Sequence, residues 1–171
     1  MSKKRSLVCD TTLLLYLGRI GQADLLLALF EPIVVPEVVL SELDMGRLVR
    51  RDTINPRQLN WITTVLVPQN DMDALPPNRL GVGERAVIAY ARSHSGYLVG
   101  LDDHQARQLA ERIGLTVVGT IGVLLKSKQA GLIPAIRPLL DTVQSEGFRL
   151  GLDLYQQVLR LAGEGWEGQD C

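Results

Sequence analysis

The sequence predicts an α/β protein in which helices cover both faces of a parallel, doubly wound sheet. Short apolar runs alternate with helical patterns along the chain, as is typical of strand–helix–strand units. Of the 171 residues, 46% are hydrophobic and only 5% are aromatic, so we expect an aliphatic core of the kind that such layered folds have. This length suits a single domain. We expect one α/β/α sandwich over residues 1–171, with its core at 6–130, a helical region at 131–162 and a frayed tail at 163–171.

The individual elements follow from hydrophobic periodicity and from the residues that bound each run. The strands expected from short apolar runs are Ser6–Cys9, Ile33–Val35, Ile62–Val67, Leu98–Leu101 and Thr116–Val118. The helices expected from the 3.6-residue period are Thr12–Leu17, Gln22–Phe30, Pro36–Met45, Gly83–Ser95, Asp103–Ile113, Thr120–Gln129, Pro134–Ser145 and Leu152–Leu161.

Proline and glycine set several of the expected boundaries. Pro36 and Pro134 fit the first turn of a helix, where a missing backbone N–H costs nothing. Gly96 and Gly114 fit positions just after a helix end. The segment Gln69–Gly83 combines prolines and glycines with polar residues, so we expect a loop there.

Composition excludes several classes of function. The 18 basic and 19 acidic residues give a net charge of −1, so any binding of nucleic acid must come from a local basic patch. Asp10 interrupts the first apolar run too early for a signal peptide, and no run reaches membrane-spanning length. We therefore expect a cytoplasmic protein without a membrane partner. The two cysteines and two histidines favour neither a disulfide framework nor a structural zinc site.

Carboxylates follow two of the expected strands. Asp10 comes directly after Ser6–Cys9, and Asp102 and Asp103 come after Leu98–Leu101. In open parallel sheets, ligands bind outside the carboxyl ends of the strands. Two like charges about 4 Å apart repel by roughly 4 kcal/mol at a protein surface, so the aspartate pair requires compensation.

Two glutamates fall on the apolar stripes of expected helices. Glu42 follows Val38 and Val39 at helical spacing, and Glu84 begins the stripe that continues at Val87 and Ile88. A buried charge without a partner is costly. Acids that converge without matching bases are most simply reconciled by divalent cations.

Capping offers a simpler explanation for several of these acids. Asp10 and Asp103 each precede an expected helix and could be its N-cap, and Glu84 in a first turn complements the helix dipole. Glu42 lies within its helix and has no capping role. The basic residues that could instead reach Glu42 as ion-pair partners are Arg47 and Arg85.

The order and spacing of these acidic motifs resemble the PIN-domain ribonucleases. The motifs are Asp10 with two following threonines, PEVVLSEL, GERAVIAYA and LDDHQAR, and the resemblance runs from about Leu7 to Gln129. The stretch VVGTIGVLLKSKQAGLI resembles one PIN subgroup described as predicted nucleic-acid-binding proteins. The resemblance implies a divalent-metal-dependent endoribonuclease that uses Mg²⁺ or Mn²⁺. Because many relatives are toxins held by antitoxins, often as dimers, it also implies an RNA substrate, an antitoxin partner and a homodimer.

Carried over position by position, the resemblance implies four catalytic acids. Asp10 corresponds to the first family acid, Glu42 to the second and Glu84 to the third, and the fourth is Asp103 or Asp102. All five side chains are candidate metal ligands. Many relatives have aspartate where this chain has Glu84, and the longer side chain could shift a metal or weaken a second metal site.

Two further expectations concern residues around the acids. Thr120 could orient a metal-bound water through its hydroxyl, or it could cap its own helix. The stretch GRLVRRDTINPR contains four arginines and one acid, Asp52, and could bind RNA, because arginine suits phosphate groups. It could equally be a solvated helix end and loop. The arginines of this expected patch are Arg47, Arg50, Arg51 and Arg57.

One alternative belongs to a different class of function. The chain could be a non-catalytic subunit with a PIN-like fold that binds nucleic acid or protein and whose acids no longer hold metal productively. Dependence of activity on a divalent metal would distinguish the two.

Overall fold

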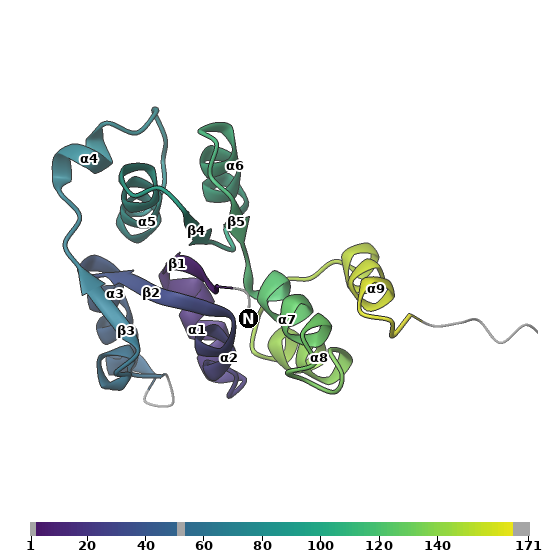
Figure 1. Ribbon diagram of the computed structural model, residues 1–171. Coiled ribbons are helices and arrows are strands. Elements are labelled where there is room, and N and C mark those ends of the chain that lie inside the picture. Colours follow the sequence, from purple (N-terminus) through teal and green to yellow (C-terminus); the bar gives the residue numbers. More distant parts are fainter. Residues whose placement is uncertain (1–2, 51–53, 166–171) are drawn as a thin grey trace, which may run out of the picture.

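Five parallel strands form the central sheet of the computed structural model (Figure 1), which describes residues 3–50 and 54–165. In spatial order, β3-β2-β1-β4-β5, the strands are β3 (Ile62–Val65), β2 (Phe30–Pro36), β1 (Arg5–Cys9), β4 (Tyr97–Gly100) and β5 (Val117–Val118). Leu7 of β1 is level with Ile33 of β2 on one side and with Leu98 of β4 on the other. The predicted parallel sheet is confirmed, and its strand order reverses between β1 and β4.

Helices cover both faces of this sheet (Figure 1). They are α1 (Thr11–Arg19), α2 (Asp24–Leu29), α3 (Glu37–Val49), α4 (Gln69–Asp73), α5 (Val82–Ser93), α6 (His104–Arg112), α7 (Thr120–Gln129), α8 (Arg137–Ser145) and α9 (Leu152–Leu161), with a short 3₁₀ turn at Pro56–Gln58. Helices α1, α2 and α3 lie on one face, and α5 and α6 lie on the other (Figure 1), as right-handed crossovers require. The predicted α/β/α architecture is confirmed.

The core is aliphatic and centres on β1. Leu7, Val8 and Val99 have no exposed surface, because a central parallel strand is covered by helices on both faces. Leu140 of α8 and Val158 of α9 belong to the same apolar cluster as these strand residues. The two C-terminal helices therefore contribute side chains to the same apolar cluster as the sheet.

The structure corrects several predicted boundaries. Phe30 was expected to end a helix but begins β2, because the chain passes from α2 into the strand without an intervening turn. The expected loop Gln69–Gly83 contains α4, which buries Met72; five residues are too few to show a helical period. Pro36 ends β2 and is the N-cap of α3. Helix α8 begins at Arg137, three residues after the expected Pro134.

Other predicted boundaries are confirmed. Gly96 and Gly114 adopt φ angles of 90° and 87°, the left-handed conformation that favours glycine after a helix. No helix within residues 3–50 and 54–165 is long and apolar enough to cross a membrane. The part of the expected tail that follows Gly165 lies outside the described residues.

Candidate active site

Asp10 lies at the point where the strand order reverses. Its backbone N–H donates to the carbonyl of Gly100 at the end of β4 (3.1 Å), and its side chain is 2% exposed. Oδ1 accepts hydrogen bonds from the N–H groups of Thr12 (3.1 Å) and Leu13 (3.3 Å), so the alternative that Asp10 caps α1 is confirmed. Its other oxygen, Oδ2, accepts no hydrogen bond from the described residues and keeps its lone pairs for a ligand.

Glu42 reaches the same site from α3. Thr11 Oγ1 donates to Glu42 Oε2 (2.6 Å), and the N–H of Gly83 donates to Oε1 (3.1 Å). A Cβ atom on Gly83 would lie 2.8 Å from Oε2, so any other residue here would displace the Glu42 carboxylate. Glu42 was expected on the core-facing stripe of its helix, but it is not buried there. Val39 and Leu43 are buried, but Glu42 is exposed because it stands at the border of the stripe, beside an opening.

Glu84 completes a set of three acids around one opening. It lies in the first turn of α5, where Oε2 accepts a hydrogen bond from the N–H of Gly81 (3.0 Å). The opening is a pocket of about 290 Å³ whose lining contains no lysine or arginine. The lining residues are Asp10, Thr11, Thr12, Glu42, Gly81, Gly83 and Glu84. The structure therefore brings together three of the predicted acids, from the start of α1, the interior of α3 and the start of α5.

Asp102 and Asp103 bind the starts of two different helices. Asp103 Oδ2 accepts from the N–H of Ala106 (2.9 Å) and caps α6. Asp102 instead binds Thr120 at the start of α7, with Oδ1 accepting from its N–H (2.7 Å) and Oδ2 from its hydroxyl (2.6 Å). Thr120 is not the cap of its own helix, because that position belongs to Gly119. The hydrogen bonds that each aspartate receives offset part of their mutual repulsion.

The five acids are linked electrostatically. Burial raises the pKa of Asp10, and the charges of Asp102 and Glu84 raise it further, while two backbone N–H groups of α1 oppose the shift. Burial also raises the pKa of Glu84, and Asp103 and Glu42 add to this effect. The pKa of Asp102 is raised by burial, against its hydrogen bonds from Thr120. A bound cation would relieve this shared repulsion.

The donor set fits a hard divalent cation, although no ready-made cage is present. Within residues 3–50 and 54–165, no three His, Cys, Asp or Glu side chains are grouped as a metal-ligand set. Mg²⁺ usually keeps several waters and binds through one or two carboxylates and a substrate phosphate. The unbonded Oδ2 of Asp10 and the nearby carboxylates supply such oxygen donors.

Sequence reasoning missed the residues that position these acids. Thr11 and Gly83 hold Glu42, and Arg107 lies beside Asp102 and opposes the rise in its pKa. The two glycines before Glu84 were a visible signal, because a glycine inside a helix start often marks a close approach. Arg85, considered as a partner of Glu42, instead forms an ion pair with Asp73 (3.2 Å).

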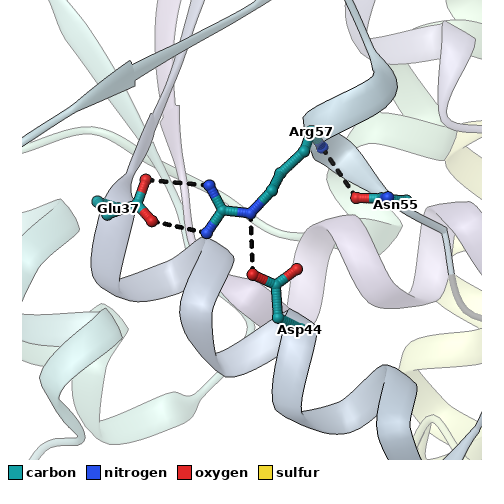
Figure 2. Close-up of polar contacts among 4 residues, drawn as sticks. All are labelled: Glu37, Asp44, Asn55 and Arg57. Atoms are coloured by element: carbon teal, nitrogen blue, oxygen red, sulfur yellow. Dashed lines mark hydrogen bonds and ion pairs between the residues drawn. The ribbon is translucent and has the colours of Figure 1, made fainter.

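Acidic side chains form ion pairs with two arginines of the expected patch, Arg50 and Arg57. Figure 2 shows Arg57 held by two side chains of α3: its guanidinium binds Glu37 through two hydrogen bonds (2.6 and 3.2 Å), and its Nε donates to Asp44 (2.8 Å). The N–H of Arg57 donates to Asn55 Oδ1 (3.2 Å). The hydrogen bonds and charge of Arg57 lower the pKa of Glu37. Arg57 thus ties the segment after α3 back onto that helix.

A second arginine of this segment also pairs with an acid. Arg50 forms an ion pair with Glu146 (3.2 Å) near the end of α8. Arg47 lies in the last turn of α3, and Arg51 lies outside the described residues. Asp52 is the one acid within the stretch itself, but the fold brings distant acids to Arg50 and Arg57.

Fold and site together define a class: α/β/α proteins with a carboxylate pocket at the reversal of strand order. The comparison with protein families agrees, because residues 6–164 match the model of a family described as a PIN domain. The chain belongs to the PIN-domain family. A search of curated proteins gave no match. PIN domains are generally nucleases, and they typically use divalent metals.

Proposed function

We propose that this PIN-domain protein is a divalent-metal-dependent endoribonuclease. The observation that carries the proposal is the pocket at the β1–β4 reversal, where Asp10, Glu42 and Glu84 face one opening whose lining has no basic side chain. Ligands of open α/β sheets bind at such a reversal. The general nuclease character of the family supports the same conclusion.

In this proposal the acids hold Mg²⁺ or Mn²⁺. Asp10, Glu42 and Glu84 are the first candidates, and Asp103 is the fourth, because one of its oxygens accepts no hydrogen bond from the described residues and its charge affects Glu84. When bound, such a cation lowers the pKa of a coordinated water and neutralises charge on the leaving oxygen. Both oxygens of Asp102 accept hydrogen bonds from Thr120, so in this proposal Asp102 has a positioning role and fixes the start of α7 beside the site.

Neighbouring groups fix the acids in position. Thr11 and the N–H of Gly83 orient the two oxygens of Glu42, and two N–H groups of α1 orient Asp10. Side chains that are held in this way need little rearrangement when a cation and a phosphate arrive. The roles of Thr11 and Gly83 are therefore positioning roles.

The test is cleavage of a mixed pool of structured and single-stranded RNA by purified protein in Mg²⁺, in Mn²⁺ and in EDTA. The Asp10→Asn, Glu42→Gln double variant should be inactive. Asp153→Asn is a matched control, because Asp153 is an exposed acid of α9 without a hydrogen bond or ion pair among the described residues. Cleavage that persists in EDTA or in the double variant would contradict the proposal. A folded protein that binds RNA but never cleaves it would favour the non-catalytic alternative.

We further propose that the protein is the cytoplasmic toxin of a toxin–antitoxin pair and forms a homodimer. The family relation supports this role, and α9 offers apolar surface, since Leu152 is 69% exposed and Leu161 is 56% exposed. Induced expression should arrest growth, and a small protein encoded beside the gene should relieve the arrest. Light scattering after size-exclusion chromatography measures the oligomeric state. Harmless expression of an active nuclease would exclude the toxin role alone.

A further inference from the structure

A second, larger opening lies beside the acid pocket. It has a volume of about 690 Å³ and runs between the connection before α5 and the outer side of α6. We call it the α6 groove; its lining includes Arg79, Leu80, Gln105, Gln108, Glu111 and Arg112.

One end of the α6 groove adjoins the acid pocket. Leu80 lines the groove, and the next residue, Gly81, lines the acid pocket. On the other wall, Gln105 stands two residues after Asp103. From Gln105 to Arg112 the helix rises by roughly 10 Å, so the groove leads away from the acids over a distance that exceeds the spacing of successive phosphates.

The loop wall of the groove is braced from within. Asn78 Oδ1 accepts from the N–H of Leu80 (3.1 Å), and Asn78 Nδ2 donates to the carbonyl of Pro76 (2.8 Å). Pro76 and Pro77 restrict the backbone of the same loop. Arg79, which is exposed, is therefore presented from a structured turn.

The basic and amide side chains of the groove are available to bind a ligand. Among the described residues, the side chains of Arg79 and Arg112 form no hydrogen bond or ion pair, and the side-chain amides of Gln105 and Gln108 form no hydrogen bond. Arg57 and Arg85, by contrast, bind acids. The lining contains no aromatic ring, so a ligand cannot stack on an aromatic side chain there, and the arginines and amides are the groups that can recognise a polar ligand.

We propose that the α6 groove binds the single strand of nucleic acid that continues from the cleaved bond. Arg79 and Arg112 contact its phosphates, since guanidinium groups match phosphate geometry, and Gln105 and Gln108 contact sugar or base edges. This inference rests on the proposed nuclease function and names the surface that holds its substrate. Glu111 lies in the same groove and opposes an anionic strand.

The test measures binding of a labelled single-stranded RNA by fluorescence anisotropy in EDTA, where the proposed cleavage cannot occur, beside DNA of the same sequence. Arg79→Gln and Arg112→Gln should each weaken RNA binding about two- to fivefold. Together they should reduce the slope of log affinity against log salt by roughly 1.4. Glu111→Gln should strengthen binding. Arg149→Gln, which changes an exposed arginine between α8 and α9 that has no partner among the described residues, should change nothing.

Cleavage kinetics provide a second readout. In Mg²⁺, the double arginine variant should show a raised KM with an unchanged kcat, because it removes ground-state binding. Equal thermal midpoints would show that the variants fold. Unchanged RNA affinity and salt slope in the double variant, with a wild type that cleaves RNA, would overturn the groove and leave the nuclease standing.

The remaining outcomes separate the two proposals. Weakened RNA binding in a protein that never cleaves RNA would support the groove and reject the nuclease. A wild type that binds neither RNA nor DNA would overturn the groove as well. Weakened binding of DNA alone would overturn the RNA assignment of the groove.

Discussion

The arginine-rich segment 47–57 and the α6 groove differ in what their described guanidinium groups bind: Arg50 and Arg57 pair with acids, whereas the arginines of the groove do not. Arg57 in the first region binds Glu37 and Asp44 (Figure 2). Arg79 and Arg112 in the second bind no acid among the described residues. Local charge counting favoured the first region, because its opposing acids are distant in sequence. Availability of a charge is thus a property of the fold and not of the local sequence.

The largest effect should come from the acid pocket that the groove adjoins. Asp10→Asn removes a buried negative charge and a metal donor, so we expect cleavage to fall at least about 100-fold. Asparagine still accepts hydrogen bonds from the start of α1, so circular dichroism should show an intact fold. If the variant cleaves RNA normally, the acid pocket is not the site of cleavage, and the α6 groove does not lead to that site.

Gly83 lies between the two regions. Its N–H binds Glu42 of α3, the helix that Arg57 also binds, and it follows the loop that lines the α6 groove. In Gly83→Ala the new Cβ would lie 2.8 Å from Glu42 Oε2, so Glu42 must move. We expect an activity loss of roughly 10- to 100-fold. Gly46→Ala is the matched control within α3, where a Cβ meets nothing within 4 Å. It should retain activity, and equal losses in both variants would exclude a specific contact.

The repulsion among the acids should appear as a pH dependence of stability. Because burial and neighbouring acids raise the pKa of folded Asp10, the metal-free native state binds more protons than the unfolded state above about pH 4. Its free energy of unfolding should therefore fall as pH rises, by at most about 1.4 kcal/mol per pH unit from this group. Thermal unfolding in EDTA across this range measures the slope.

Two additions make that measurement specific. Asp10→Asn should flatten the slope, and Mg²⁺ should restore stability at the higher pH. A slope that is identical in the variant would assign the pH dependence to other groups.

The smallest effects distinguish the two arginine regions most sharply. Arg57→Gln should slightly lower the thermal unfolding midpoint and leave RNA affinity unchanged, because its contacts are internal and exposed to solvent. Arg79→Gln should leave the thermal unfolding midpoint unchanged and weaken RNA binding. If Arg57→Gln weakened RNA binding as much as Arg79→Gln, the segment 47–57 would be the RNA surface that the sequence predicted.

The sheet and the general position of the acids could be predicted from the sequence. Strand cores such as Leu7–Cys9 are continuous apolar runs, and a carboxylate after such a run points to the ligand-binding edge of a parallel sheet. Helix α4 could not be predicted, because its five residues bury only Met72. The exposure of Glu42 also depended on how α3 meets the start of α5.

The contacts that could not be predicted join residues far apart in the chain. Thr120 lies 18 residues from Asp102, and Glu37 lies 20 residues from Arg57. Neither pair follows a helical or strand period, so only the three-dimensional arrangement reveals them. The sequence identified the acids but not the groups that hold them.

The division of work between Asp102 and Asp103 predicts different mutational tolerance at adjacent positions. Asparagine can cap a helix as well as aspartate, so a change to asparagine at position 103 should be silent for folding. The same change at position 102 places an amide against two donors of Thr120, where one carboxylate now accepts both hydrogen bonds. In a library selected for folding alone, asparagine should accumulate at 103 and remain rare at 102.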